Sequence, residues 1–151
     1  MPLDAATAGI LSMDAVECLD ELIQQCDVLF ICAPLNASTR HSVNDESLAK
    51  AKPGIQLINI SRGSCVDESA VADALESGSI GGYAADVFGF EDWILEERPD
   101  RIDARLLSHP RTLFSPHLGS AVTSTRRSIE RAAADEIVRW KNDEPYKFRV
   151  N

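Results

Sequence analysis

Hydrophobic and polar positions alternate along this chain in blocks that predict strands and helices in turn. Apolar blocks predict buried strands at residues 28–32, 55–60, 80–87 and 112–115. Helical spacing predicts helices at residues 14–25, 44–51, 67–78 and 121–140, whereas residues 1–13 show no clear period. From the first strand onward the order is strand, helix, strand, helix, strand, loop, strand, helix. That alternation is typical of an α/β fold with a doubly wound parallel sheet.

Side chains at the ends of the predicted helices favour the same boundaries. Asn44 and Asp67 are residue types that cap helix N-termini, and Gly78 is suited to closing the helix that Asp67 begins. The continuously apolar strand at residues 28–32 predicts burial on both faces. The first and last helices each carry apolar residues on one face: Val16, Leu19, Leu22 and Ile23 in the first, and Ile129, Ala132, Ala133, Ile137 and Trp140 in the last. In the helix at residues 67–78 we expect an inner face made of Ala70, Val71, Ala74 and Leu75.

Two stretches depart from this regular pattern. The third strand predicts a close neighbour at its small residues, which are Gly81, Gly82, Ala84 and Ala85. Residues 88–107 are polar, charged and irregular, and they include Trp93. A loop of this length in a compact domain is usually functional or disordered.

Composition narrows the class of protein. The chain has 151 residues, of which 44% are hydrophobic and 26% charged, as in one soluble globular domain. The formal net charge of −9 and the lack of a basic cluster argue against nucleic acid as a partner. No apolar run approaches the ~20 residues of a membrane span, and the first residues lack the basic start of a signal peptide. We therefore expect a cytoplasmic protein with no membrane partner.

The cysteines give no sign of a metal site. They are Cys18, Cys26, Cys32 and Cys65, and they form no Cys-x-x-Cys pair. Their spacings indicate no zinc site. We expect free, buried thiols in a reducing cytoplasm.

The most informative stretch for function is residues 54–68, which reads GIQLINISRGSCVDE. A buried strand there ends in a polar turn and leads into a helix, and open α/β sheets bind their ligands at such carboxyl ends. Arg62 in that turn is suited to binding a small oxyanion. The alternative is a surface arginine that pairs with Asp67 or Glu68.

Two further strand ends carry side chains suited to chemistry. The segment from Asp86 to Glu91 has a carboxylate at each end, and His117 follows the last strand. Parallel strands would bring these ends and Arg62 to one edge, where they could transfer a proton on an anionic substrate. A carboxylate would fix the imidazole tautomer and raise its basicity. Alternatively, His117 is an ordinary turn residue, as we expect of the other two histidines, His41 and His109.

Three ordered motifs resemble those of the D-isomer-specific 2-hydroxyacid dehydrogenases. Residues 59–67 (NISRGSCVD) resemble the third signature of that family, and residues 82–88 (GYAADVF) resemble its following strand. Residues 116–119 (PHLG) resemble the motif that holds its catalytic histidine. The resemblance covers roughly residues 14–140. It implies a Rossmann-like fold, NAD as cofactor, a small anionic substrate and a homodimer in the intact enzyme.

A narrower resemblance is to phosphite (phosphonate) dehydrogenase, one branch of this family. Most members follow the third strand with an acidic segment that ends in proline, whereas this chain has Glu91-Asp92-Trp93 and then Arg98-Pro99. The branch implies oxidation of phosphite by NAD and water to phosphate and NADH. The alternative is an ordinary D-2-hydroxyacid dehydrogenase that reduces a 2-keto acid, although Trp93 and the long loop argue against it.

The resemblance also implies a role for each site residue. Arg62 would bind and orient the substrate anion, Glu91 would hydrogen-bond His117, and His117 would act as general base on the attacking water. Arg126 would add positive charge, unless it only pairs with Glu130 one helical turn later. Asp86 would face the nicotinamide carboxamide, unless it merely caps its strand. The other residues expected to hold the nucleotide are Cys32, Ala33, Pro34, Ile60, Ser61 and Gly119.

The phosphate-binding turn of the family, Gly-x-Gly-x-x-Gly, is absent, as is the acidic residue that would select NAD over NADP. We therefore expect residues 1–151 to be a partial NAD-binding domain, the C-terminal half of a dehydrogenase without its substrate domain, and inactive alone. A non-catalytic dimerisation or binding module is a further alternative. Against it, a purely structural role does not require Arg62, Glu91 and His117.

Overall fold

The computed structural model describes residues 14–119 and 121–148, and the chain divides into two units. The first unit ends at Pro116 and holds the sheet, whereas the second begins at His117 and holds one long helix. The segment at residues 1–13 lies outside the described residues. In chain order the elements are α2 (Leu19–Gln25), β1 (Val28–Ile31), α3 (Asp45–Ala49), β2 (Ile55–Asn59), η1 (Gly63–Cys65), α4 (Glu68–Ser77), β3 (Ile80–Ala85), η2 (Gly89–Glu91), α5 (Ala104–Ser108), β4 (Thr112–Phe114) and α6 (Thr123–Lys141).

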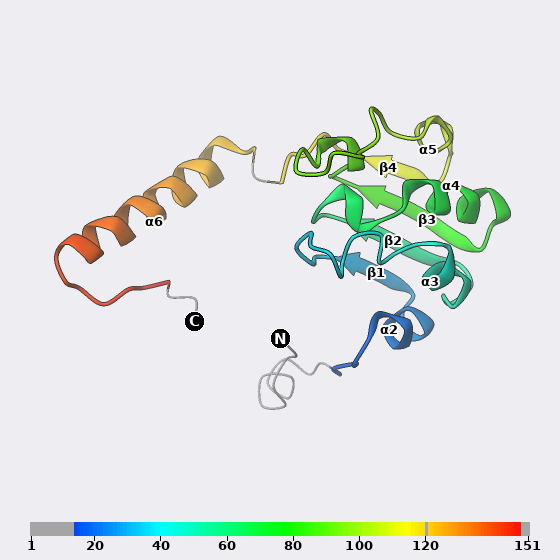
Figure 1. Ribbon diagram of the computed structural model, residues 1–151, viewed down its shortest axis with the longest axis horizontal. Helices are drawn as coiled ribbons and strands as arrows, with labels where there is room; N and C mark the ends of the chain where they lie inside the picture. The colour runs from blue at the N-terminus through cyan, green and yellow to red at the C-terminus, as the bar shows by residue number, and fades with distance from the viewer. Residues whose placement is uncertain (1–13, 120, 149–151) are drawn as a thin grey trace. The chain divides into compact units, whose positions relative to one another are not determined.

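Within the described part of the first unit, four parallel strands form one sheet and lie side by side in the order β1-β2-β3-β4 (Figure 1). Leu29 pairs with Leu57, and Ile58 pairs with Ala84. The predicted α/β fold with a parallel sheet is therefore confirmed. Because all four strands run in one direction, their carboxyl ends lie at one edge, where such sheets bind ligands.

The core of the first unit joins one face of this sheet to its helices. Leu57 and Ile80 contribute from the strands, and Ile23 and Leu106 contribute from α2 and α5. The expected inner face of α4 is confirmed, since its apolar positions are all buried: Ala70, Val71, Ala74 and Leu75. This packing anchors the turn that connects β2 to α4.

The other face of the sheet is exposed at several apolar side chains. Val28 is 43% exposed, Phe30 is 58% exposed, and Leu113 of β4 is 74% exposed. The expectation that the strand at residues 28–32 is covered on both faces is therefore wrong. Successive side chains of a strand point to opposite faces, and only Leu29 and Ile31 of β1 reach the core.

The small residues of β3 do have a close neighbour, as predicted. A Cβ on Gly81 would lie 2.2 Å from Nε2 of Gln56 and 2.4 Å from the carbonyl oxygen of Gly54. A Cβ on Gly82 would lie 2.5 Å from Oε1 of Gln56. Glycine at these positions therefore lets β3 pack closely against β2.

Local capping explains where the helices begin and end. The Asn44 side chain accepts the Ser47 amide at 3.0 Å, and the Asp67 carboxylate accepts the Ser69 amide at 3.0 Å, as predicted for α3 and α4. Gly78 closes α4 with a φ of 78°. The first helix begins at Leu19 rather than at residue 14, so that prediction is wrong. Before it, the Glu21 carboxylate accepts the Glu17 amide at 3.1 Å and satisfies that donor outside the helix.

The segment at residues 88–107 is more ordered than its composition predicts. It contains η2 and the beginning of α5. Asp103 caps the N-terminus of α5, because its carboxylate accepts the Arg105 amide at 2.9 Å. The Arg98 guanidinium lies 4.1 Å from the centroid of the Trp93 ring, a cation–π contact that closes the loop between them. The expectation of a wholly irregular loop is therefore wrong.

The helix of the second unit, α6, is confirmed, and the side chains of its apolar face are exposed. Ile129, Ile137 and Trp140 are 56%, 66% and 65% exposed. Among the described residues no side chain of α6 is buried. The physical reason is that the described part of the second unit contains no other helix or strand.

The described cysteines are free, but the expectation that they are buried holds only for Cys65. Cys18 and Cys32 are exposed and Cys26 is half-buried, because these three lie at the ends of α2 and β1. Within the described ranges, no helix combines the length and apolarity needed to cross a bilayer.

Candidate active site

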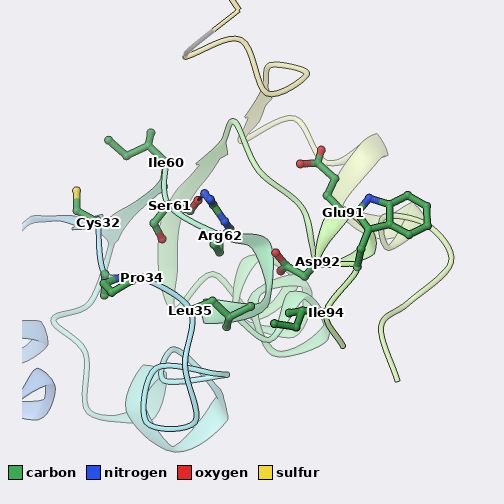
Figure 2. A pocket seen from close by; sticks show the side chains of 11 residues that line it. Cys32, Pro34, Leu35, Ile60, Ser61, Arg62, Glu91, Asp92 and Ile94 are labelled. Carbon is green, nitrogen blue, oxygen red and sulfur yellow. Dashed lines mark hydrogen bonds between the residues drawn. The ribbon is translucent and has the colours of Figure 1, made fainter. Parts of the chain in front are cut away.

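A cavity of about 570 Å³ opens at the carboxyl ends of β1 and β2. Three segments line it: residues 32–35 after β1, residues 60–62 after β2, and residues 91–94 at the end of η2. Figure 2 shows Arg62 between the Cys32 and Ile60 side and the Glu91 side. This size is within the range of small-molecule sites.

Buried Asn59 fixes the turn that presents Arg62. Its Oδ1 accepts the Ser61 amide at 3.1 Å and the Ser61 hydroxyl at 3.2 Å, while its Nδ2 donates to the Arg62 carbonyl at 3.0 Å. Asn59 is fully buried at the end of β2. The hydrogen bonds of the buried Asn59 side chain therefore fix the backbone of residues 60–62.

The Arg62 guanidinium is exposed and lines the cavity. Its Nη1 donates to the Ser61 carbonyl at 2.6 Å. The surface ion pair considered for it is wrong, because both proposed partners are engaged elsewhere. Asp67 caps α4, and Glu68 accepts the Gly89 amide at 2.9 Å. The guanidinium of Arg62 therefore stays exposed in the cavity wall.

Glu91 and Asp92 stand on the other side of the cavity. Glu91 is half-buried, and its amide donates to the Phe88 carbonyl at 3.0 Å, which closes η2. Asp92 is only 7% exposed, and its Oδ2 accepts the Ser64 amide at 2.7 Å. The wall beyond them is the loop that Trp93 and Arg98 close.

Most residues expected at the site are brought together in this cavity. Its lining includes Arg62, Glu91 and the expected nucleotide-binding residues Cys32, Ala33, Pro34, Ile60 and Ser61. Asp86 lines an adjoining apolar hollow of about 280 Å³ with Leu113 and Ser115, and Ile60 lines both. The Ser115 hydroxyl donates to Asp86 Oδ1 at 2.6 Å.

The remaining expected residues, His117, Gly119 and Arg126, belong to the second unit. His117 adopts a left-handed conformation with a φ of 52°. Arg126 is in the first turn of α6 and is exposed, and within the described residues no ion pair joins it to Glu130. The cavity is therefore built from residues of the first unit alone.

Sequence reasoning gave no role to several residues of this site. Asn59 stood within the matching motif, and Asp92 and Trp93 stood in the segment that sets this chain apart from most of the family. Leu35 and Ile94, which also line the cavity, carried no signal beyond their positions next to expected site residues. Proximity to Arg62 or Glu91 in the sequence was the available clue.

Comparison with known proteins decides the family. Residues 4–119 match the model of the D-isomer specific 2-hydroxyacid dehydrogenase, NAD binding domain. The chain belongs to this dehydrogenase family. Its cofactor class is therefore NAD. The four-stranded sheet is accordingly part of a Rossmann-like NAD-binding domain.

Related dehydrogenases are considerably longer than this chain. Glyoxylate/hydroxypyruvate reductase B of Pectobacterium carotovorum is 41% identical over 133 residues, which cover 88% of this chain and 39% of that protein. D-lactate dehydrogenase of Lactobacillus delbrueckii is 38% identical over 138 residues, which cover 85% and 41%. The solved structure of Rhodotorula graminis D-mandelate dehydrogenase matches the whole chain with a TM-score of 0.84 and 25% identity, over 42% of its own length. The chain thus spans about two fifths of these proteins.

The residues of the cavity fit the nicotinamide end of a dinucleotide. Cys32, Ala33, Pro34 and Ile60 are small or apolar side chains that are exposed at strand ends, so a flat ring can lie against them. Ser61 adds a hydroxyl beside them. The exposed guanidinium of Arg62 follows directly, which leaves a cationic position next to the place for the ring.

Proposed function

We propose that the native protein is an NAD-dependent dehydrogenase of a small oxyanion, and that the oxyanion is phosphite. The observation that carries the proposal is that exposed Arg62 and half-buried Glu91 line the same cavity, beside a wall of small or apolar side chains. An anion held by the guanidinium would lie between that wall and the carboxylate. This is the arrangement that oxidation of an anion by a bound nicotinamide requires.

The residues of the first unit would hold the two reactants. Cys32, Ala33, Pro34, Ile60 and Ser61 would contact the nicotinamide nucleotide, and Asp86 in the adjoining hollow would face its carboxamide. When bound, NAD supplies the two-electron acceptor of the reaction. Arg62 would bind and orient phosphite, and its positive charge would stabilise the negative charge that accumulates in the transition state.

The remaining roles rest on the family motifs. His117 would take a proton from the attacking water, Glu91 would orient its imidazole, Gly119 would contact the nucleotide, and Arg126 would add positive charge. In the balanced reaction, phosphite, water and NAD⁺ give phosphate, NADH and one proton. The P–H bond breaks with loss of two electrons from phosphorus, and a P–O bond to the water oxygen forms.

Phosphite is favoured by the segment that follows β3. Glu91 is followed there by buried Asp92 and by Trp93, whose ring stacks with Arg98, rather than by the proline segment of most family members. Trp93 and Ile94 of this segment also line the cavity. A D-2-hydroxy acid is the second candidate, because the similar proteins include a glyoxylate/hydroxypyruvate reductase and a D-lactate dehydrogenase.

A substrate comparison tests the proposal. The native protein, at the full length that its gene encodes, is incubated with NAD and phosphite, D-lactate or D-glycerate in turn, and NADH formation is followed. The proposal would be supported if NADH forms with phosphite but with neither hydroxy acid, and if one phosphate appears for each NADH. Turnover of the hydroxy acids without phosphite turnover would assign the second candidate instead.

A further inference from the structure

Two carboxylates connect the segment that carries Glu91 to the turn that carries Arg62. Asp92, directly after Glu91, accepts the Ser64 amide through Oδ2 at 2.7 Å. In the opposite direction, Glu68 in the first turn of α4 accepts the Gly89 amide through Oε1 at 2.9 Å. Each segment thus provides one carboxylate that accepts a backbone amide of the other segment. We call this pair of hydrogen bonds the carboxylate brace.

The brace closes a direct contact between two stretches of backbone. A Cβ on Gly63 would lie 1.8 Å from the carbonyl carbon of Phe88 and 2.1 Å from the amide nitrogen of Gly89. No side chain fits at residue 63 while the two stretches stay in place. Glycine brings the backbones together, and the two hydrogen bonds on either side of it fix their relative position.

One carboxylate of the brace, that of Asp92, is in the cavity wall. Asp92 is buried and lines the cavity, and Figure 2 shows it between the Arg62 turn and the Glu91 side. Ser64, whose amide it accepts, is in η1, two residues after Arg62. A change in the brace would therefore shift Arg62 and Glu91 relative to each other.

We infer that Asp92 and Glu68 are positioning residues, which hold the Arg62 guanidinium and the Glu91 carboxylate at a fixed separation across the cavity. The inference rests on the proposed function, in which both side chains serve one small substrate. Catalysis is sensitive to such placement, since a displacement of about 1 Å can cost about 100-fold in rate. Neither positioning residue needs to touch the substrate.

The kinetic test compares Asp92→Ala with Asp92→Asn in the native protein. Asparagine keeps an oxygen that can accept the Ser64 amide, whereas alanine removes it. The quantity measured is kcat/KM for phosphite, or for a hydroxy acid if the protein turns that over instead. We expect Asp92→Ala to lower it by about tenfold or more and Asp92→Asn to lower it by less than about threefold. The KM for NAD should stay within about twofold in both, because neither variant changes a residue that is expected to contact the nucleotide. The control is Asp100→Asn, an exposed acid of the same loop.

Amide exchange measured by NMR tests the brace without any turnover. Asp92→Ala should speed exchange of the Ser64 amide, and Glu68→Ala should speed exchange of the Gly89 amide. The reference is the Val71 amide inside α4, which donates to the Asp67 carbonyl at 3.1 Å and should not change. General destabilisation would speed exchange at all three positions.

Kinetics of Asp92→Ala equal to those of Asp100→Asn would overturn the inference, as would unchanged exchange at Ser64. A native protein that oxidises neither phosphite nor a hydroxy acid would instead overturn the proposed function. In that case the exchange measurement still decides whether the brace exists.

Discussion

The backbone at His117 is in a conformation that costs free energy. Its φ of 52° is in the left-handed region, which costs a residue with a Cβ about 1 kcal/mol relative to glycine. His41 shares this feature with a φ of 49°. This conformation does not by itself assign a role, since we expect His41 to be an ordinary turn residue. The two histidines provide a matched pair for testing the proposed role of His117.

We predict that His117→Gly lowers turnover of the native protein by about 100-fold or more, the usual range for loss of a general base. Its free energy of unfolding should stay within about 1 kcal/mol of wild type, because relief of strain offsets the greater freedom of glycine in the unfolded chain. His41→Gly should show the same small change in stability and unchanged turnover. Steady-state kinetics and denaturant unfolding measure both, and equal activity of the two variants would show that His117 is an ordinary turn residue.

Glu68 makes part of the stability depend on pH. Burial raises the pKa of its carboxyl above the ordinary 4.5, and the hydrogen bond from Gly89 only partly opposes this. In the pH window just above 4.5 the folded state therefore binds more protons at Glu68 than the unfolded state does. Its contribution to stability falls as pH rises through that window and is constant above the folded pKa.

We predict that Glu68→Gln removes this fall while keeping an acceptor for the Gly89 amide. The free energy of unfolding of wild type minus that of the variant should decrease as pH rises from about 4 to about 7. Urea denaturation at several pH values measures the difference. An increase with pH would mean that the folded state favours the charged carboxylate.

At the scale of residues, sequence reasoning found Arg62 because a cation after an apolar strand is a local pattern. It gave Asp92 no role because the partner of Asp92, the Ser64 amide, is 28 positions away. It likewise missed Asn59, whose polar side chain is buried at the end of an apolar strand. Roles that depend on such tertiary contacts cannot be read from spacing.

At the scale of elements, the contact between η1 and η2 depends on one glycine. We predict that Gly63→Ala costs about 3 kcal/mol of unfolding free energy, because its Cβ would overlap the backbone of Phe88. Gly54→Ala is the control. Gly54 has a φ of 81° but open space around it, so only the left-handed strain of about 1 kcal/mol applies. Equal costs in thermal or denaturant unfolding would contradict the close backbone contact.

The elements themselves were predicted well where their signals are local. The caps of α3 and α4 and the parallel direction of the strands follow from nearby residues and alternating apolar blocks. The predicted burial of β1 on both faces was wrong. Burial of a face depends on what packs against it, and an apolar pattern does not identify that partner.

At the scale of the whole molecule, the chain corresponds to one part of the dehydrogenases that it resembles. It spans about two fifths of the similar dehydrogenases, with 39% of one and 41% of another, and it has no Gly-x-Gly-x-x-Gly turn. We predict that residues 1–151 alone bind NAD poorly and form no NADH with phosphite, because no such turn cradles the dinucleotide phosphates. Calorimetric titration with NAD and a turnover assay measure this, and phosphite-dependent NADH formation by residues 1–151 would contradict it.

The central claim is that Arg62 binds the substrate anion in the cavity at the strand ends. Its most direct test is kcat/KM for phosphite in the native protein carrying Arg62→Ala, with Arg101→Ala, an exposed arginine of the neighbouring loop, as control. We expect a loss of about 100-fold or more for Arg62→Ala and no change in the control. Arg62→Lys, which keeps the charge but not the planar fork, should recover part of the activity. Turnover of Arg62→Ala equal to that of Arg101→Ala would contradict the account.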